Sequence, residues 1–284
     1  MNPTAWRVND MLELMLECGR IGLHHFENSE WWLKPDQTLV TPADGEIETL
    51  LDRQFNHPEQ GSWMLGEETV GDHDEAYIQA MLKGRAWVVD PIDGTAPYAH
   101  KLAYWGTSIG LMENGVLTEG AIILPQQGEI FISNHGQVFF AEKIDVYGSV
   151  DQVDLCLLAP HPRPLNDGSM IALSQLVAKT GRFQRPNPVQ VTGCAVSSLM
   201  YLMLGRYLAY FGHLKLWDVA GALPMLLKTG FEARHPDGSP LTATVDNTHY
   251  VLEAGAPNRW TVRQGSVFAP KGMAVSLLSA VQFS

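Results

Sequence analysis

Two acids lie three positions apart where an apolar run ends, in Trp87-Val88-Val89-Asp90-Pro91-Ile92-Asp93-Gly94-Thr95. Ala86–Val89 has the composition of a buried strand, Pro91 stiffens the turn, and Gly94 permits a close approach. Carboxylates with a backbone carbonyl between them are oxygen ligands that suit a hard cation such as Mg²⁺. Backbone N–H groups at the start of a following helix would attract a phosphate to the same point. An Asp-rich turn that only ends a strand explains the same spacing equally well.

The composition is that of a folded globular protein, because 45% of the 284 residues are hydrophobic and 18% are charged. This length predicts one or two domains. The 31 acidic residues outnumber the 19 Lys and Arg residues, for a net charge of -12. Such a balance argues against broad binding to nucleic acid or to an anionic membrane and is compatible with the binding of divalent cations.

The three cysteines, Cys18, Cys156 and Cys194, are scattered and have no CxxC spacing. They exclude a disulfide framework and a zinc cluster. The first ten residues lack the hydrophobic region of a signal peptide, and the longest charge-free stretch, Pro186–Gly205, is too polar for a membrane span. We therefore expect a cytoplasmic protein without membrane contact.

The N-terminal part is expected to supply two helices and a short strand. Apolar residues at three- and four-residue spacing predict a helix from about Thr4 to Asn28. Thr41-Pro42-Ala43-Asp44 predicts the start of a second helix, with Thr as N-cap, Pro in the first turn and an acid three residues after the cap. A strand near Trp63–Leu65 ends at Gly66-Glu67-Glu68, and Thr69–Gly84 has the composition of an acidic, variable excursion.

The middle of the chain predicts an antiparallel meander. The segments Tyr104–Met112 and Val116–Leu124 flank a turn at Glu113-Asn114-Gly115. Asn134-His135-Gly136 is a second hairpin signal, between Glu129–Ser133 and Gln137–Ala141.

After about residue 145 the pattern changes to alternating strands and helices, which predicts a sheet with helices on its faces. The expected strands are Val153–Ala159, Tyr207–Phe211 and Phe231–Arg234, and the expected helices are Gly168–Thr180, Ala195–Leu204 and Trp217–Thr229. We expect an α+β domain over residues 1–145, an α/β domain over residues 146–284, and a cleft between them. The pattern of Ala256–Ser284 is not assigned.

Four separated segments resemble the inositol monophosphatase family of Mg²⁺-dependent, Li⁺-sensitive phosphatases. In order, they are Lys34-x-Asp36-x-Thr38-x-Val40-Thr41-x-Ala43-Asp44, Gly66-Glu67-Glu68, Asp90-Pro91-Ile92-Asp93-Gly94-Thr95 and Trp217-Asp218-Val219-Ala220-Gly221. Gly193-Cys194-Ala195 also resembles a Gly-Ser/Thr-Ala segment of the family. The similarity runs from about residue 5 to residue 255.

The resemblance implies a metal site and a water-positioning pair. Two or three Mg²⁺ ions would be held by Glu67, Asp90, Asp93, Asp218 and the Ile92 carbonyl, with Asp90 bridging two of them. Asp44 and Thr95 would orient the attacking water, and the backbone amides of Gly94 and Thr95 would hold the phosphate. Gly193, Cys194 and Ala195 would lie beside the substrate.

Each acid also has a purely structural interpretation. Asp44 completes a capping box with Thr41, and an acid can do this while it presents its other oxygen to a ligand. Asp218 complements the dipole of the helix that it begins. A metal-activated water needs no side-chain nucleophile. A cysteine phosphatase would instead need a low-pKa thiolate in an electropositive loop. None of the three cysteines has such surroundings.

The chain departs from the family pattern on the substrate side. Ala96-Pro97-Tyr98 replaces the usual Thr-Asn-Phe. Phe211 stands where inositol-specific members have a Glu that grips sugar hydroxyls, and Lys215 stands where they have His. A Lys could favour a second phosphate or could pair with a surface acid of little energetic consequence.

The expected fold is the family's layered α/β/α/β/α sandwich, and the resemblance also suggests a homodimer. The expected function is hydrolysis of inositol monophosphate or a related small polyol or sugar phosphate. Fructose 1,6-bisphosphate and 3′-phosphoadenosine 5′-phosphate are alternative substrates. A non-catalytic regulatory binding protein and a cation-binding structural protein on the same fold are hypotheses of other classes.

Overall fold

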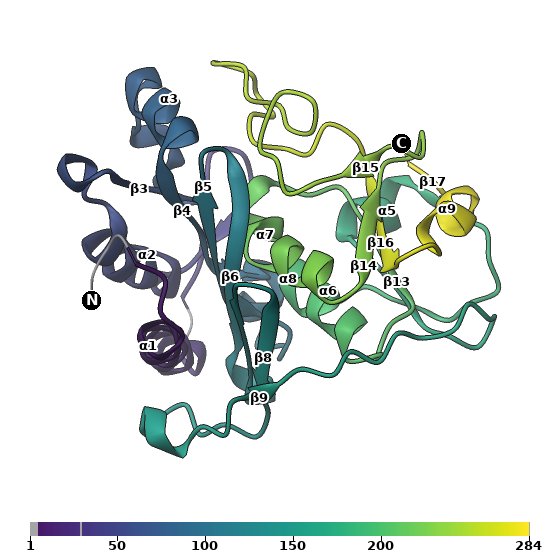
Figure 1. Ribbon diagram of the computed structural model, residues 1–284, viewed down its shortest axis with the longest axis horizontal. Coiled ribbons are helices and arrows are strands. Elements are labelled where there is room, and N and C mark those ends of the chain that lie inside the picture. Colours follow the sequence, from purple (N-terminus) through teal and green to yellow (C-terminus); the bar gives the residue numbers. More distant parts are fainter. Residues whose placement is uncertain (1–4, 29, 284) are drawn as a thin grey trace.

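The computed structural model describes residues 5–28 and 30–283, and it has five layers in the order α/β/α/β/α (Figure 1). A seven-stranded sheet has the order β3-β4-β5-β6-β7-β8-β9, and a six-stranded sheet has the order β12-β10-β13-β16-β14-β15. One pair of helices covers the outer face of the first sheet, three helices lie between the sheets, and two short helices cover the outer face of the second. The expected layered sandwich is confirmed.

The outer helices of the first sheet are α1 (Val8–Phe26) and α2 (Pro42–Phe55). Their buried faces pack on Trp87 and its neighbours in the sheet. The predicted start of α2 is confirmed, because the Thr41 N–H and hydroxyl both donate to Asp44 Oδ2, at 2.8 and 2.6 Å. The expected first helix is shorter than predicted at its N-terminal end, and Thr4 lies outside the described residues.

The first sheet contains both predicted hairpins. Its strands are β3 (Ser62–Gly66), β4 (Arg85–Asp93), β5 (Gly106–Glu113), β6 (Val116–Leu124), β7 (Glu129–Asn134), β8 (Gln137–Ala141) and β9 (Cys156–Leu157). Only β3 and β4 pair in parallel. A parallel pair needs a crossover, and helix α3 (Glu75–Lys83) supplies it within the segment that we expected to be an acidic, variable excursion.

Strand β4 continues past Val89, where the sequence predicted its end. Its pairing with β5 changes register between Asp90 and Asp93. In a regular strand, residues three apart point to opposite faces of the sheet. The irregularity therefore allows the two acids at the end of β4 to face the same side.

The middle layer consists of α6 (Ala195–Met203), α7 (Leu216–Ala220) and α8 (Ala222–Lys228). The single helix expected over Trp217–Thr229 is thus divided at Gly221. Gly110 and Gly120 face each other across β5 and β6, and a Cβ on either would overlap the backbone of Ala220 or Gly221. The glycine pair lets the junction of α7 and α8 lie directly on the first sheet.

The second sheet contains β10 (Ile171–Leu173), β12 (Val189–Gln190), β13 (Ala209–Gly212), β14 (Phe231–Arg234), β15 (Pro240–Leu241) and β16 (Ser266–Pro270). Helices α5 (Gln175–Thr180) and α9 (Ala274–Leu277) cover its outer face. Two small antiparallel pairs complete the fold, β1 (Trp32–Leu33) with β2 (Leu39–Val40) and β11 (Arg182–Phe183) with β17 (Val281–Gln282).

Two predictions in the C-terminal half were wrong in part. The first half of the expected helix Gly168–Thr180 is strand β10 and its lead-in, and only Gln175–Thr180 is helical. Of the expected strand Val153–Ala159, Cys156–Leu157 alone is a strand, and it pairs with β8. The first sheet therefore extends beyond residue 145, where the sequence suggested a domain boundary.

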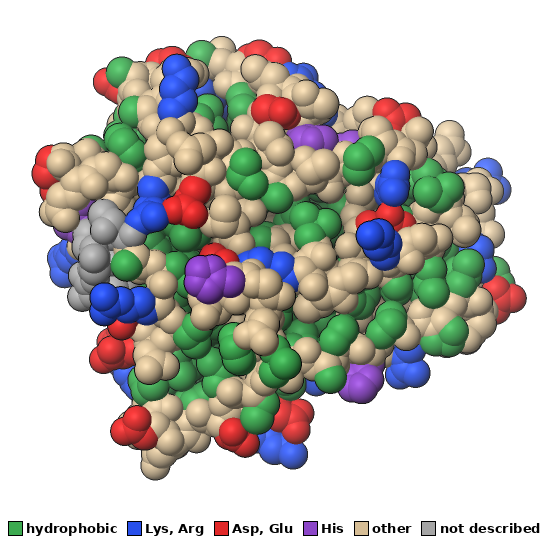
Figure 2. Space-filling view, viewed as in Figure 1, with side chains coloured by type: hydrophobic (Ala, Val, Ile, Leu, Met, Phe, Trp, Pro, Cys, Tyr) green, Lys and Arg blue, Asp and Glu red, His purple; other side chains and the backbone are tan. Residues whose placement is uncertain are grey.

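On the face shown in Figure 2, acidic and basic side chains are interspersed, without a large patch of a single charge. Among the helices of the described chain, we find none with the length and apolar character needed to cross a bilayer.

Candidate functional site

Three carboxylates meet between the first sheet and the middle helices. Asp90 and Asp93 come from the end of β4, and Asp218 comes from α7; one carboxylate oxygen of each lies within 4.8 Å of the others. Asp218 reaches this point because the glycine pair brings α7 against β4 and β5. Residues more than 120 positions apart in the sequence thus form one acidic cluster.

Burial and the repulsion between like charges raise the pKa values of Asp90, Asp93, Asp218 and the neighbouring Glu67. The pKa of Asp90 lies well above its usual value because of desolvation, then repulsion by Glu67 and Asp93. Burial and Asp93 raise the pKa of Asp218 to about 7. The pKa of Glu67 is raised to about 8, by burial first and then by Asp218. Such a set of buried like charges needs a cation to be stable in its ionised form.

The donor set fits a hard divalent cation. Asp90 Oδ1 and Asp44 Oδ1 are buried, and neither has a hydrogen-bond partner in the part of the chain that the structure describes. A buried carboxylate oxygen without a partner is costly, so each of the two is available to a ligand. All the candidate groups here are oxygen donors, which is the preference of Mg²⁺.

The turn that follows Glu67 is bonded by a residue that the sequence analysis did not identify, Glu48. The Glu48 carboxylate on α2 accepts hydrogen bonds from Glu68 N at 3.0 Å, Thr69 N at 2.8 Å and Thr69 Oγ1 at 2.6 Å. A Cβ at position 66 would overlap this carboxylate, so Gly66 is what allows the turn after β3 to close on it. The available signal was spacing: Glu48 lies four residues after Asp44, on the same face of the helix.

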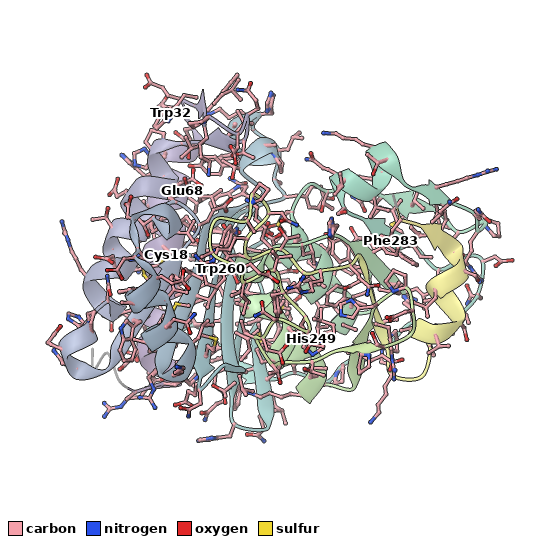
Figure 3. All side chains as sticks on the ribbon, turned by 90° about the horizontal axis from the view of Figure 1, so that it is seen from above. Cys18, Trp32, Glu68, His249, Trp260 and Phe283 are labelled. Carbon is pink, nitrogen blue, oxygen red and sulfur yellow. The ribbon has the colours of Figure 1, made fainter. Side chains whose placement is uncertain are left out.

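Lys34 balances part of this charge. Its ammonium group bonds both carboxylate oxygens of Glu68, at 2.8 and 2.9 Å, and lies 3.9 Å from Glu67. Glu68 lies on the N-terminal side of the molecule, as does Trp32 of β1 (Figure 3). Through Lys34, the β1–β2 hairpin contributes a positive charge to the turn that contains Glu67 and Glu68.

The cluster opens into a cavity of about 450 Å³. Most of the predicted site residues line it, namely Glu67, Asp90, Ile92, Asp93, Gly94, Thr95, Gly193, Cys194, Ala195 and Asp218. Asp44, Phe211 and Lys215 are not among its lining residues. Asp44 is buried, with Oδ2 bonded to Thr41 and Oδ1 unpartnered as described above.

Gly94 and Gly193 both have backbone conformations that favour glycine, with φ of 89° and 77°. A Cβ on Gly94 would lie 2.7 Å from the Tyr104 carbonyl oxygen. Next to it, Thr95 Oγ1 donates to the Ile92 carbonyl at 3.1 Å. The turn after β4 is therefore closed tightly around the acids.

Cys194 supports Asp93 and is not a nucleophile. Its thiol donates to Asp93 Oδ2 at 3.0 Å, and Val196 N donates to the same oxygen at 2.6 Å. Burial, and then the charge of Asp93, raise the pKa of the Cys194 thiol. Such a thiol does not provide the thiolate that a cysteine phosphatase requires.

The structure does not place Phe211 at the cavity, where we expected it to contact the substrate. Its side chain is fully buried on the outer side of the second sheet. Its ring packs near Phe183 and Phe283, with centroid distances of 6.2 and 6.4 Å. Side chains alternate along a strand, and it is the preceding residue, Tyr210, that lines the cavity. Phe211 therefore leaves the set of candidate substrate contacts.

Lys215 precedes α7, and its backbone N–H donates to Asp218 Oδ2 at 2.8 Å. Its ammonium group lies 5.0 Å from the centre of the Trp217 ring. Within residues 5–28 and 30–283 it forms no ion pair, so pairing with a surface acid does not account for it.

The sequence analysis missed much of the substrate side of the cavity. These residues come from the β1–β2 hairpin and from the segments that follow β10 and β13, and include Gln37, Thr38, Ser174, Gln175, Lys179 and His213. Strands β10 and β13 are parallel neighbours, so their carboxyl ends meet at one edge of the sheet. Ligands bind at such edges in many α/β proteins, and correct assignment of β10 as a strand would have pointed to them.

The raised pKa values predict a dependence of stability on pH. The carboxyl groups of Glu67, Asp93 and Asp218 bind protons more tightly in the folded protein than in the unfolded chain. Their contribution to the free energy of unfolding is therefore complete below about pH 4 and is lost as the pH rises through about 6 to 8. We expect the metal-free protein to melt roughly 5 °C lower at pH 8.5 than at pH 5.5, and Mg²⁺ to reduce this difference. Thermal melts at both pH values, with EDTA or with Mg²⁺, measure it; equal melting in EDTA would contradict the prediction.

The sequence profile of the inositol monophosphatase family matches residues 5–271. The chain is 27% identical to the Nus factor SuhB of Xylella fastidiosa over 234 residues, which cover 78% of this chain and 79% of the relative. It is 28% identical to the inositol-1-monophosphatase of Bacillus subtilis over 231 residues, 78% of this chain and 80% of that one.

A solved structure described as an IMPase/NADP phosphatase complexed with Mg²⁺ and phosphate has a similar fold, with a TM-score of 0.66 at 14% identity. The alignment covers 93% of this chain and 90% of that chain. The profile match extends over nearly the whole chain, and the layered fold agrees with it. The chain therefore belongs to the inositol monophosphatase family, a family of phosphatases.

Proposed function

We propose that this protein is a Mg²⁺-dependent phosphomonoesterase that hydrolyses inositol monophosphate or a related small polyol or sugar phosphate. The observation that carries the proposal is the buried cluster of Asp90, Asp93 and Asp218 at the wall of the large cavity. Its charge, its oxygen donors and the unpartnered Asp90 Oδ1 all favour a divalent cation beside a space that admits a small ester.

In this proposal Glu67, Asp90, Asp93, Asp218 and the Ile92 carbonyl hold two or three Mg²⁺ ions. When bound, such ions lower the pKa of a water molecule and offset charge on the attacking and leaving oxygens of the ester. Phosphate monoesters hydrolyse extremely slowly without a catalyst, so electrostatic stabilisation and positioning must supply most of the rate.

The remaining residues of the site position the reactants. Thr41 fixes Asp44 through Oδ2 and leaves Oδ1 to accept a hydrogen bond from the attacking water. The Thr95 hydroxyl is the second group proposed to orient that water. The backbone amides of Gly94 and Thr95 would hold the phosphate, in a turn that the φ of Gly94 makes accessible.

Substrate choice depends on the side of the cavity where the chain departs from its relatives. Phe211 points away from the cavity and offers no hydrogen-bond acceptor to a sugar hydroxyl. Lys215 forms no ion pair with the other described residues and could contact a second anionic group. Fructose 1,6-bisphosphate and 3′-phosphoadenosine 5′-phosphate are therefore the alternative substrates to inositol 1-phosphate.

The direct test is release of inorganic phosphate from these three esters with Mg²⁺, with EDTA, and with Li⁺ added to Mg²⁺. We expect release that requires Mg²⁺ and that Li⁺ inhibits. A preference for inositol 1-phosphate supports the first substrate class. The alternative is supported by a preference for a doubly phosphorylated ester. In that case Lys215→Ala should lower the rate of phosphate release from that ester severalfold and leave the rate with a monophosphate unchanged. Release in EDTA at the same rate would contradict the metal-dependent proposal.

A regulatory binding role is a second candidate, and the similarity to the Nus factor SuhB favours it. It predicts a stable protein partner that binds equally well to the protein and to its Asp90→Asn variant. Failure to release phosphate from every ester tested, together with such a partner, would support this role in place of catalysis.

We also propose that the protein is a cytoplasmic homodimer. Sedimentation equilibrium would test the oligomeric state.

A further inference from the structure

A second cavity, of about 270 Å³, adjoins the catalytic cavity. The two share Leu176 on α5 and His213 after β13 as lining residues. The catalytic cavity alone lies within the range of about 300 to 1,000 Å³ that holds most small-molecule ligands, and the second cavity adds about 270 Å³ to it. A substrate longer than a polyol phosphate could therefore place its phosphate at the acids and extend past His213.

The second cavity continues along the same edge of the six-stranded sheet. Gly212 at the end of β13 pairs with Ser266 at the start of the antiparallel strand β16. The residues that precede β16, Gln264 and Gly265, therefore lie beside the carboxyl end of β13 and line this cavity. The edge of the six-stranded sheet that lines the catalytic cavity thus lines the second cavity as well.

Phe283 forms a wall of this cavity. Strand β17 pairs with β11 and anchors the C-terminal segment, and in Figure 3 the labelled ring lies beside the C-terminal helix, drawn in yellow. A Cβ at position 265 would overlap the Phe283 ring, so the ring rests directly on the backbone of Gly265. The family match ends at residue 271, so this wall is a feature of this chain outside the matched region.

The lining of the second cavity favours a neutral, planar group. Leu176, Val177, Pro236 and Phe283 supply apolar surface. Arg263 is the one Lys or Arg among the described residues that line the cavity, and it already bonds the Glu253 carboxylate and the Asn247 carbonyl. No cation is left over for a second phosphate among the described residues that line it.

His213 adds a polar group at the junction of the two cavities. Its ring forms no hydrogen bond with other described residues, and its side chain is partly exposed. An imidazole there can bond a hydroxyl or a ring nitrogen of a ligand that passes between the cavities.

We infer that the second cavity binds a neutral planar ring carried by the alcohol part of the phosphate ester, with Phe283 as the wall on which the ring stacks. The inference rests on the proposed function and adds to its substrates the phosphate esters of alcohols that carry a planar ring. Apolar contact with one face and a polar rim are the arrangement that suits such a ring.

The test compares 2-naphthyl phosphate with glycerol 2-phosphate, which has the same reacting group and no ring. In Phe283→Ala we expect kcat/KM for 2-naphthyl phosphate to fall about five- to tenfold. For glycerol 2-phosphate it should change less than about twofold, and Phe283→Tyr should retain activity on both esters. Val275→Ala, at an exposed apolar position on α9, is the matched control. Equal losses on both esters in Phe283→Ala would show that the ring only supports the fold and would overturn the inference.

Direct binding separates this inference from the proposed function. The dissociation constant of 2-naphthol for the metal-free protein, measured by ligand-observed NMR, should rise about five- to tenfold in Phe283→Ala. If the wild-type protein hydrolyses neither these two esters nor the three esters of the proposed function, that function fails, and this binding difference still supports the ring site. If 2-naphthol binds both proteins equally, or neither, the ring site is refuted whatever the activity.

Discussion

Replacing Asp90 by asparagine is expected to abolish Mg²⁺-dependent phosphate release, with a loss of at least about a thousandfold in kcat. Asp90 belongs to the acidic cluster and carries an oxygen with no partner among the described residues, so the amide removes both a charge and a proposed ligand atom. The substitution preserves the size of the side chain, and the fold should be retained. Phosphate release under saturating Mg²⁺ measures the effect, and circular dichroism checks the fold.

The same variant should stabilise the metal-free protein. Removing one of several buried like charges relieves repulsion in the cluster, so Asp90→Asn should melt a few degrees higher than the wild type in EDTA at pH 8. Added Mg²⁺ should then raise its melting temperature less than that of the wild type. Asp151→Asn, at an exposed acid far along the chain, is the control and should change neither quantity. An Asp90→Asn protein with full activity would refute the metal site.

Replacing Glu48 by glutamine should weaken Mg²⁺ binding by about 10- to 100-fold without touching any proposed ligand. Glu48 accepts three hydrogen bonds from Glu68 and Thr69, and a glutamine amide would turn its NH₂ group toward some of those donors. The turn would then no longer hold Glu67 in one orientation. We also expect a loss of about 1 to 3 kcal/mol in the free energy of unfolding.

The readout for Glu48→Gln is the Mg²⁺ concentration that gives half-maximal activity, measured beside a denaturant unfolding curve. Glu46→Gln, on the same helix and two residues away, is the matched control, because Glu46 is exposed and its one side-chain bond to a described residue is with His25. A variant that loses stability while its Mg²⁺ dependence stays that of the wild type would show that Glu48 supports the fold and does not position Glu67.

Local signals in the sequence were sufficient for the elements that depend on local chemistry. The N-cap of α2 at Thr41 and the hairpin at Asn114-Gly115 were predicted because capping and turn formation involve only neighbouring residues. The acids of the site were identified through the resemblance to a family. The structure then brought Asp90, Asp93 and Asp218 into one cluster.

The errors share a cause, which is that tertiary contacts decided the outcome. Three residues, Ile171–Leu173, are too few for periodicity to separate strand from helix, and β10 exists because β12 and β13 pair with it. The face on which Phe211 lies depends on the register of β13, which no local signal specifies. Glu48 was missed because its role depends on a turn that lies about twenty residues away in the chain.

The contact of Gly110 and Gly120 with the junction of α7 and α8 has a consequence for the order of folding. The acids at the end of β4 are synthesised well before Asp218, and the helix that carries Asp218 can reach them only after it has docked on those glycines. A nascent chain that ends before α7 therefore contains the first sheet's acids without the rest of the cluster. Contacts of such long sequence separation form slowly and late. High-affinity binding of Mg²⁺ should consequently appear only once the final third of the chain has joined the fold.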